Sequence, residues 1–330
     1  MNQRKINVGV LGAGRLAEVL TRLLEVADSA KIRLWARRAD ARGAFAKAHP
    51  AVEVCDSVGP VAGPADVVFF TVPSTAIEEV ADLYGPYARG DQVVIHASRG
   101  VSDGFRLPHQ LIRGKTCVRK LVAIGGPLHS RELTTGRILP AAVASRFEEG
   151  IQAVRELTQG TPIRVHPSSD LIGVEVANAI SNVTALASGM SEALELGDTA
   201  RGLLLTRGLA EAQRLGVALG AEAPTFAGIA GLGDLIPRRV SSTDRHHAVG
   251  ARVARGERLS RALEEAGGVV EGVVTAKEAA AMAERLGLKL PLIEAVDRAL
   301  RQEAEARAAI EALLHLDLDD LLTTPSRRAV

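Results

Sequence analysis

Short apolar runs separated by glycine, proline and polar residues fill the first half of the chain, whereas long stretches rich in alanine and leucine fill the second half. The run Ile6–Leu11 predicts a strand, and Gly12 and Gly14 follow it directly. The stretch Leu16–Glu25 then has the apolar spacing of an amphipathic helix. We therefore expect a strand, a tight turn and a helix at the start of the chain.

Further apolar runs predict strands, and they are Lys31–Ala36, Asp66–Val72, Gln92–Ala97 and Leu121–Ile124. Glycine, proline or polar residues follow each run, and Ala76–Leu83 begins a helix between two of them. Strands that alternate with helices in this way are typical of an α/β fold with a doubly wound parallel sheet. Ligands bind such sheets at the carboxyl ends of the strands. We therefore expect one cleft to be faced by the loops after Leu11, Val72, Ala97 and Ile124.

The pattern changes at about Asp170, where long helical segments replace the short strands. We predict an α/β domain over residues 1–169 and an all-helical domain over residues 170–330. Helices are expected in the second domain over Thr275–Leu286 and Lys289–Leu300. The chain is long enough for both domains to bury cores of their own.

One helix of the second domain, predicted over Leu171–Gly189, carries polar residues on an otherwise apolar surface. Glu175, Asn178 and Asn182 share one face at helical spacing, and Ser181 lies beside them. A helix this apolar is central in its domain, and buried amides must be hydrogen-bonded, so we favour a stripe that lines a cleft. The alternatives are a solvated edge, or small residues that allow close helix packing.

A glycine-dense stretch inside the helical region, Thr225–Ile236, predicts a functional loop or a tightly packed helix crossing. Charged and histidine side chains follow it closely, and they are Arg238, Arg239, Asp244, Arg245, His246 and His247. A group this cationic suits an anionic substrate or an anionic part of a cofactor. The alternative is an exposed basic loop.

Composition narrows the partners and the compartment. The chain has 40 basic and 39 acidic residues, so its charge predicts neither nucleic-acid nor anionic-membrane binding. The cysteines, Cys55 and Cys117, fit a reducing compartment better than a disulfide framework. The first predicted strand starts close to Met1, which leaves no room for a signal peptide. No uncharged apolar run approaches the roughly 18 residues of a membrane span. We expect a soluble, cytoplasmic protein without membrane insertion and without a metal site.

The turn Gly12-x-Gly14-x-x-Ala17 has the spacing of a dinucleotide-binding fingerprint. The first glycine permits the tight turn, the second lets the backbone approach a pyrophosphate, and the small third residue lets the helix pack closely. The N–H groups at the helix start, beginning with Arg15 and Leu16, face the phosphates with the favourable end of the helix dipole. Because the fingerprint lies between a predicted strand and a predicted helix, we predict dinucleotide binding.

The second predicted strand is followed by Arg37 and Arg38 rather than by an acidic residue. An acidic residue about 20 positions after the glycines would bind a ribose 2′-hydroxyl group, whereas arginine suits a 2′-phosphate. We therefore favour NADPH as the cofactor. The alternative is a pair of solvated arginines at a strand end, with NADH as the cofactor.

Taken together, these segments resemble the bacterial NAD(P)-dependent glycerol-3-phosphate dehydrogenases over roughly residues 6–300. The matching motifs are Gly12-Ala-Gly14, Leu34–Arg37, Val72-Pro73, Gly126-Pro127, Gly173–Glu175, Thr206–Leu209, Thr225–Leu235, Arg245, Val270–Val273 and Thr275-Ala276. The resemblance implies an N-terminal Rossmann domain, a helical C-terminal domain with substrate bound between them, and a homodimer. It also implies reversible reduction of dihydroxyacetone phosphate, a small phosphorylated molecule, by NADPH or NADH.

The residue chemistry and the resemblance together predict roles for particular positions. The cofactor-binding positions are Gly12, Gly14, Arg15, Leu16, Arg37, Arg38, Val72, Pro73, Arg245 and Glu271. Substrate-binding positions are Arg99, Arg238, Arg245 and His246, and the catalytic positions are Ser181, Asn182, Asp234 and His129.

Several of these positions depart from the family pattern. The family has a lysine before the asparagine of the central helix, where this chain has Ser181-Asn182. That lysine is the family's general acid/base, and an uncharged serine cannot replace it. A second lysine is replaced by Arg99, which keeps the charge but donates no proton near neutral pH. The remaining departures are Leu128, His129, Arg238, Arg239 and His246, which stand where the family has serine, phenylalanine, threonine, cysteine and asparagine.

Two functional hypotheses follow. The first is an oxidoreductase that transfers hydride between NAD(P)H and dihydroxyacetone phosphate or a related small carbonyl compound, including a keto or imino acid. In it, Arg245 with Arg99 and Arg238 would hold a phosphate. His129 or His246 would supply the proton, although His129 is equally interpreted as a loop histidine without a special role. The second hypothesis is a cofactor-binding pseudoenzyme that acts as a sensor or scaffold.

Overall fold

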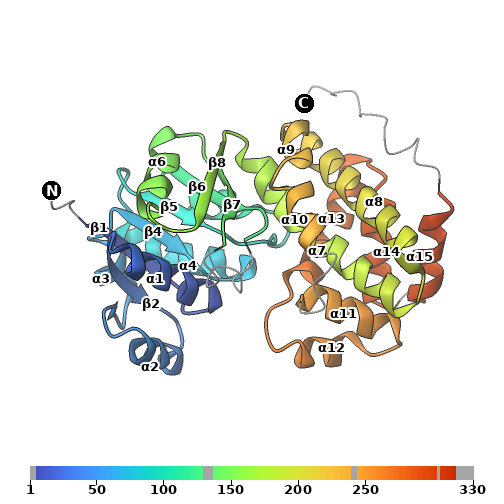
Figure 1. The fold of residues 1–330 in the computed structure, drawn as a ribbon, viewed down its shortest axis with the longest axis horizontal. Helices are drawn as coiled ribbons and strands as arrows, with labels where there is room; N and C mark the ends of the chain where they lie inside the picture. Colours follow the sequence, from blue (N-terminus) through green and yellow to red (C-terminus); the bar gives the residue numbers. More distant parts are fainter. Residues whose placement is uncertain (1–4, 129–136, 239–243, 303–304, 317–330) are drawn as a thin grey trace. The chain divides into compact units, whose positions relative to one another are not determined.

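The computed structural model describes residues 5–128, 137–238, 244–302 and 305–316, apart from the side chain of Arg238. The chain divides into two compact units (Figure 1). Unit 1 comprises Met1–Ser98 and Pro108–Leu171, and unit 2 comprises Arg99–Leu107 and Ile172–Val330. The segment Arg99–Leu107 thus clusters with the second half of the chain, which the sequence pattern did not indicate.

Within the described residues, unit 1 contains one eight-stranded sheet with the strand order β3-β2-β1-β4-β5-β6-β7-β8. The strands are β1 (Ile6–Leu11), β2 (Ala30–Trp35), β3 (Glu53–Val54), β4 (Val67–Phe70), β5 (Val93–His96), β6 (Lys120–Gly125), β7 (Leu139–Ala144) and β8 (Ile163–Ser168). Neighbours from β3 to β6 are parallel, so the carboxyl ends of β1, β4, β5 and β6 lie at one edge of the sheet.

The prediction of a doubly wound, parallel sheet is confirmed for β1 to β6 and needs correction at β7. This strand pairs antiparallel with β6, and β8 pairs parallel with β7. An antiparallel neighbour requires no crossover helix, so strand–helix alternation could not reveal it. The edge strand β8 has no fully buried residue and contains Pro167, whose missing N–H group is tolerated at a sheet edge.

Helices cover both faces of the sheet. They are α1 (Arg15–Ala27), α2 (Ala39–Ala48), α3 (Val58–Ala62), α4 (Ile77–Tyr84), α5 (Pro108–Lys115) and α6 (Glu148–Leu157), with the short 3₁₀ turns η1 (Ser74–Ala76) and η2 (Gly85–Tyr87). Alternate residues of each strand face opposite layers. Val8 and Val10 join the core cluster that includes residues of α1, α2 and α6. Between them, Gly9 faces α3, where a Cβ atom would lie 2.9 Å from the Val61 carbonyl oxygen.

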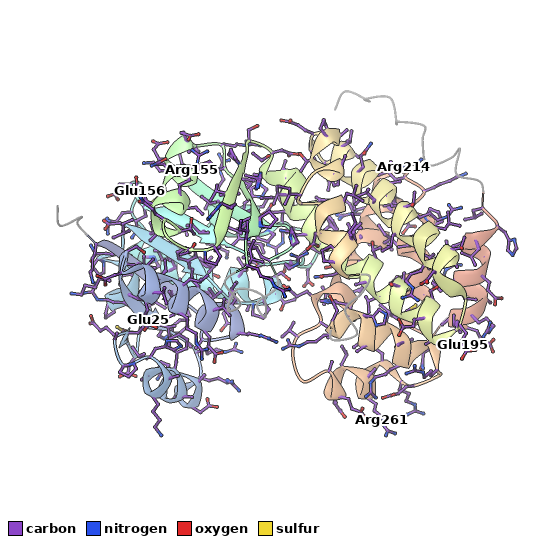
Figure 2. The ribbon with its side chains drawn as sticks, in the orientation of Figure 1. Glu25, Arg155, Glu156, Glu195, Arg214 and Arg261 are labelled. Atoms are coloured by element: carbon purple, nitrogen blue, oxygen red, sulfur yellow. The ribbon has the colours of Figure 1, made fainter. Side chains whose placement is uncertain are left out.

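Helix α6 illustrates how an amphipathic sequence covers the sheet. Ile151, Val154 and Leu157 are buried in the core cluster. Arg155 and Glu156 are exposed and extend away from the sheet in Figure 2. The 3.6-residue period thus buries one apolar face of α6 and leaves its charges in solvent.

Unit 2 is helical. Its described helices are α7 (Leu171–Ala193, of which the first residue belongs to unit 1), α8 (Gly197–Ala218), α9 (Ala223–Ala227), α10 (Leu232–Arg238), α11 (Arg245–Ala254), α12 (Leu259–Glu265), α13 (Glu271–Leu286), α14 (Pro291–Leu300) and α15 (Ala306–Leu314). Helix α7 is long and apolar enough to cross a membrane by length and composition alone, but 94% of its most apolar stretch is buried inside the protein. Burial at this level is that of a core helix, and the solvated-edge alternative for its polar stripe is wrong.

Glycines allow other helices to approach α7 closely. A Cβ atom on Gly250 of α11 would overlap the Leu186 carbonyl oxygen, and one on Gly208 of α8 would overlap the Thr184 side chain. These contacts bring backbone against backbone or against a short side chain. The small residues in this half of the chain therefore serve close helix packing.

A buried carboxyl group joins α8 to α14. Glu211 accepts hydrogen bonds from the backbone N–H groups of Leu292 and Ile293, at 2.7 and 3.0 Å. These N–H groups belong to the first turn of α14 and have no acceptor inside the helix. Burial raises the pKa of Glu211 to about 8 from its ordinary value of 4.5, because the low-dielectric interior penalises the charged form.

Candidate functional site

The turn between β1 and α1 requires glycine at its first position. Gly12 has a φ angle of +120°, which side-chain-bearing residues rarely adopt. Its N–H group donates to the Trp35 carbonyl oxygen at 2.8 Å. The Thr71 hydroxyl donates toward the carbonyl oxygens of Leu11 and Gly12, at 3.1 and 3.2 Å. A Cβ atom on Gly12 would lie 2.7 Å from that hydroxyl oxygen, so both conformation and space exclude other residues.

The second glycine of the turn has free space around its Cβ position, unlike the first. Gly14 is the N-cap residue of α1, and no side-chain hydrogen bond caps the helix. A Cβ atom there would have its nearest neighbour 3.9 Å away. The N–H groups of Arg15, Leu16 and Ala17 have no acceptor within the helix, and Ala17 is fully buried. This helix start can therefore accept an anion, as a bound pyrophosphate requires.

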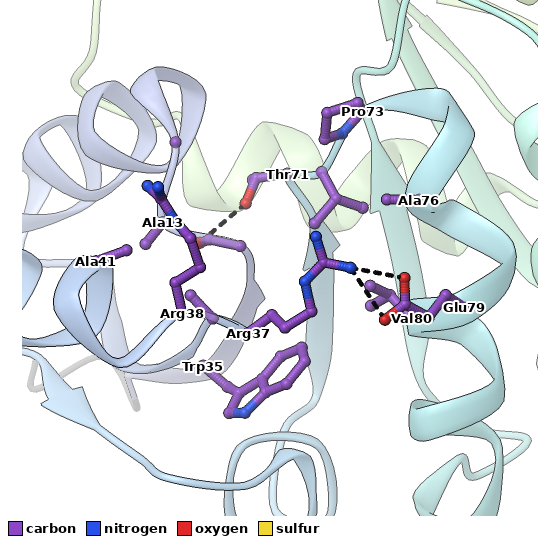
Figure 3. A pocket seen from close by; sticks show the side chains of 14 residues that line it. Ala13, Trp35, Arg37, Arg38, Ala41, Thr71, Pro73, Ala76, Glu79 and Val80 are labelled. Atoms are coloured by element: carbon purple, nitrogen blue, oxygen red, sulfur yellow. Dashed lines mark hydrogen bonds and ion pairs between the residues drawn. The ribbon is translucent and has the colours of Figure 1, made fainter. Parts of the chain in front are cut away.

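A cavity of about 230 Å³ lies at this turn (Figure 3). Its lining residues are Gly12, Ala13, Gly14, Trp35, Ala36, Arg37, Arg38, Ala41, Thr71, Val72, Pro73, Ala76, Glu79 and Val80. The predicted cofactor positions in unit 1 lie in this set, except Arg15 and Leu16, which stand in the first turn of α1. A glycine turn, an uncapped helix start and two arginines in one cavity fit a dinucleotide with an extra phosphate group.

The two arginines of the cavity have different partners. Arg37 Nη1 lies 3.0 and 3.2 Å from the carboxylate oxygens of Glu79 on α4. Arg38 Nε lies 3.8 Å from Asp40, and both of those side chains are about three-quarters exposed. Glu79 was not expected from the sequence, because no local pattern relates it to a residue 42 positions earlier.

In unit 2, Arg99 joins several of the predicted substrate and catalytic residues. Its guanidinium donates to Ser181 Oγ at 3.0 Å and forms an ion pair with Asp234. Asp234 is fully buried, and the Arg99 side chain is 20% exposed. Removing one partner from such a pair leaves a buried charge without compensation, which typically costs about 3–5 kcal/mol.

The backbone of Arg99 is held by two other predicted residues. Asn182 Nδ2 donates to the Arg99 carbonyl oxygen at 2.6 Å, and the Arg99 N–H group donates to Glu271 at 3.3 Å. Glu271 is the first residue of α13, which begins earlier than the expected Thr275. The polar stripe of α7 therefore binds the segment that carries Arg99.

That segment, Arg99–Leu107, turns back on itself within unit 2. Gly104 has a φ angle of +75° at its tip. The Gly104 N–H group donates to Glu278 on α13 at 2.7 Å, and its carbonyl oxygen accepts from Arg285 at 3.0 Å. Glu278 and Arg285 were not expected from the sequence. Glu278 and Arg285 therefore hold the tip of the segment, whereas Asn182 and Glu271 hold its first residue, Arg99.

The predicted residues of the cationic cluster lie near α11 and α13. His246 Nδ1 is 3.1 Å from Asp244, which also caps α11 by accepting from the His246 N–H group at 2.8 Å. The ring lies against Gly272, where a Cβ atom would be 2.8 Å from His246 Cδ2 and 3.0 Å from the Asn182 carbonyl oxygen. Arg245 is exposed, and its guanidinium lies against Gly268.

Other predicted positions are described only in part. Arg238 ends α10, and its side chain lies outside the described part of the chain. His129 and Arg239 also lie outside the described residues. The glycine-dense stretch before them is tightly packed, since a Cβ atom on Gly231 would overlap the Phe226 backbone. The stretch is thus closely packed, and a functional role for it stays a prediction, since its Asp234 pairs with Arg99.

Comparison with known proteins gives a consistent result along the chain. Residues 7–150 match the N-terminal model of NAD-dependent glycerol-3-phosphate dehydrogenase, and residues 170–311 match its C-terminal model. A glycerol-3-phosphate dehydrogenase [NAD(P)+] of Thermus thermophilus is 37% identical, with 94% of this chain and 98% of that protein covered. The Lacticaseibacillus paracasei protein of the same name is 33% identical, with 93% and 94% covered.

The fold comparison agrees with the sequence comparison. The crystal structure of glycerol-3-phosphate dehydrogenase from Coxiella burnetii matches with a TM-score of 0.89 and 26% identity. The match covers 94% of this chain and 99% of that one. Both the family models and the full-length relatives confirm the resemblance inferred from the motifs. The chain belongs to the NAD-dependent glycerol-3-phosphate dehydrogenase family.

Proposed function

We propose that the chain is an NAD(P)-dependent oxidoreductase that interconverts dihydroxyacetone phosphate and glycerol 3-phosphate, or a closely related small carbonyl and hydroxy pair. The observation that carries the proposal is the glycine turn and its cavity in a member of this family. Relatives that align over nearly their whole length bear the name glycerol-3-phosphate dehydrogenase [NAD(P)+]. The comparisons give no support to the alternative of a pseudoenzyme.

A bound nicotinamide cofactor would supply the hydride. The residues of unit 1 that support its binding are the uncapped N-terminus at Gly14 and the exposed guanidinium groups of Arg37 and Arg38. Two cations at the end of β2 favour a 2′-phosphate over a 2′-hydroxyl group, so NADPH is the preferred cofactor and NADH the weaker one.

Arg99 is the proposed anion-binding group of the substrate site. Its guanidinium already donates to Ser181 and pairs with Asp234, and arginine binds phosphate and carbonyl oxygen atoms well. Because guanidinium does not release a proton near neutral pH, Arg99 can stabilise negative charge but cannot serve as the acid. Arg245 and Arg238 are the proposed additional phosphate ligands.

His246 is the proposed proton donor. Its contact with Asp244 fixes the orientation of the ring, and imidazole titrates near neutrality. The ring shares the space around Gly272 with the backbone of Asn182, which in turn holds Arg99. His129 is the second candidate for this role.

We further propose that residues 1–169 form the dinucleotide-binding domain and residues 170–330 the substrate domain, with Arg99–Leu107 contributed to the latter. A cytoplasmic homodimer is the proposed form, on the basis of the family resemblance. Light scattering of the purified chain would test this, and a mass of one chain at micromolar concentration would contradict it.

The test of the reaction is NADPH oxidation with dihydroxyacetone phosphate. We expect wild-type turnover that falls by about 10²–10⁴-fold in His246→Gln, the usual contribution of a general acid. His166→Gln serves as the control, because His166 is exposed on the edge strand β8. Turnover that is lost in His129→Gln instead would transfer the acid role to His129.

A second pair of variants tests whether the substitution at Ser181 abolished the chemistry. Lysine at this position would stand beside Arg99, so Ser181→Lys is combined with Arg99→Lys, which restores both lysines of the family pattern at adjoining positions. Turnover in the double variant but not in the wild type would mean that the pocket persists and the natural reaction was lost. If every protein is inactive while NADPH still binds, the proposed substrate is wrong.

A further inference from the structure

The dinucleotide cavity contains an acidic side chain among its basic ones. Glu79 lies in the first turn of α4 and lines the cavity with Arg37 and Arg38. Figure 3 shows the Glu79 carboxylate and the Arg37 guanidinium turned toward each other. Arg37 Nη1 donates to both Glu79 carboxylate oxygens, at 3.0 and 3.2 Å. A 2′-phosphate group that enters this cavity therefore meets a carboxylate as well as two cations.

The pairing changes what each arginine offers to a ligand. Arg37 is 71% exposed and Glu79 is 52% exposed, and an ion pair this exposed is weak. A phosphate group can compete for Arg37, but only against the charge of Glu79. Arg38 lies farther from its nearest carboxylate, at 3.8 Å from Asp40. The two arginines are thus unequal, and Arg38 is the more available cation.

We propose that Glu79 is a specificity-determining residue that reduces the preference of this chain for NADPH over NADH. The inference rests on the proposed use of a nicotinamide dinucleotide. The Glu79 carboxylate repels a 2′-phosphate dianion and occupies the guanidinium that would bind it. A 2′-hydroxyl group carries no charge to repel, and it can donate a hydrogen bond to a carboxylate. Glu79 therefore disfavours NADPH selectively.

The experiment compares the binding of the two reduced cofactors, so it does not depend on turnover. Dissociation constants for NADPH and NADH are measured by nicotinamide fluorescence in the wild type and in Glu79→Gln. Glutamine keeps the size of the side chain and a hydrogen-bond acceptor for Arg37, but it removes the charge. We expect the ratio of NADPH to NADH affinity to rise by about 3- to 6-fold at low ionic strength, and by less in high salt.

The matched control is Glu78→Gln. Glu78 precedes Glu79 on α4, lies outside the cavity lining and is 3.8 Å from Lys115. Glu78→Gln removes the same charge from the same helix turn, so a long-range electrostatic effect would change the affinity ratio equally in both variants. We expect the affinity ratio of this control to stay within about twofold of the wild type. Thermal unfolding of both variants checks that the fold is retained.

Arginine variants test the inequality of the two cations. Arg38→Gln should weaken NADPH binding more than Arg37→Gln does in the wild type, and the loss from Arg37→Gln should grow when Glu79 is also glutamine. An unchanged or lower affinity ratio in Glu79→Gln, while both cofactors bind the wild type, would overturn this inference alone. Failure of the wild type to bind either cofactor would overturn the proposed function and this inference together.

Discussion

Replacing Gly12 and Gly14 separately by alanine tests whether the turn has distinct folding and binding positions. Gly12 has a φ angle of +120°, and its added Cβ atom would lie 2.7 Å from Thr71 Oγ1 and 3.0 Å from Val72 Cγ1. Backbone strain of this kind costs about 1–3 kcal/mol, and overpacking costs a similar amount. We expect Gly12→Ala to lower the free energy of unfolding by about 2–4 kcal/mol and to abolish cofactor binding.

Gly14→Ala should separate the two effects. The φ angle of Gly14 is −87°, which alanine adopts without strain, and the nearest atom to its Cβ would be 3.9 Å away. We expect a change in unfolding free energy of about 0.5 kcal/mol or less, as for substitutions that meet no other group. The new methyl group would occupy the space proposed for the pyrophosphate. Cofactor affinity should therefore fall by about 10-fold or more, which is about 1.4 kcal/mol.

Urea unfolding and cofactor titration together provide the assay. Trp35 is the single tryptophan, is largely buried, and lies at the end of β2 in unit 1. Its fluorescence therefore reports on the unit that contains the turn. Equal destabilisation of the two variants would refute the distinction between an enclosed and an open glycine. Wild-type cofactor affinity in Gly14→Ala would refute the close approach of a phosphate to this backbone.

Two further predictions concern unit 2. Because Glu211 has a folded-state pKa of about 8 against an ordinary 4.5, the unfolded chain loses a proton between these pH values that the folded chain keeps. The unfolding free energy of the wild type should then fall by up to about 1.4 kcal/mol per pH unit in that window. In urea unfolding from about pH 5 to 9, Glu211→Gln should flatten this dependence. Equal slopes for the two proteins would contradict a raised pKa for Glu211. Gly250→Ala should lower the unfolding free energy by about 1–3 kcal/mol or more, because its Cβ atom would overlap the Leu186 backbone. Gly202→Ala on α8 is the control, since nothing lies within 4 Å of its Cβ, and equal melting temperatures for the two variants would show that the helix crossing adapts.

Short-range patterns in the sequence are enough to locate most elements of the sheet. The apolar run Ile6–Leu11 predicts β1 with its observed bounds, and the other runs predict β2, β4, β5 and β6 within a residue or two. Continuous apolar runs are required of buried parallel strands, so they identify such strands without tertiary information. The long helix from Leu171 is also recognisable from local sequence, because its length and its small residues exclude a strand.

The glycine turn belongs with these local features. A φ angle of +120° at Gly12 is a property of one residue, and the chain must place glycine there to form the turn. The family motifs are likewise short contiguous segments. The family and the cofactor turn can therefore be inferred from the amino-acid sequence alone.

Tertiary packing, by contrast, sets which distant side chains meet. Arg99 reaches Asp234 across 135 positions of sequence and Ser181 across 82, and Arg37 reaches Glu79 across 42. No periodicity relates such residues, because their contact depends on how the strands and helices pack. The antiparallel strand β7 and the assignment of Arg99–Leu107 to unit 2 have the same origin. Local sequence therefore determines the helices and strands of this protein, while long-range packing determines which charged side chains share a site. The reason is that an ion pair depends on distance in space and not on separation along the chain.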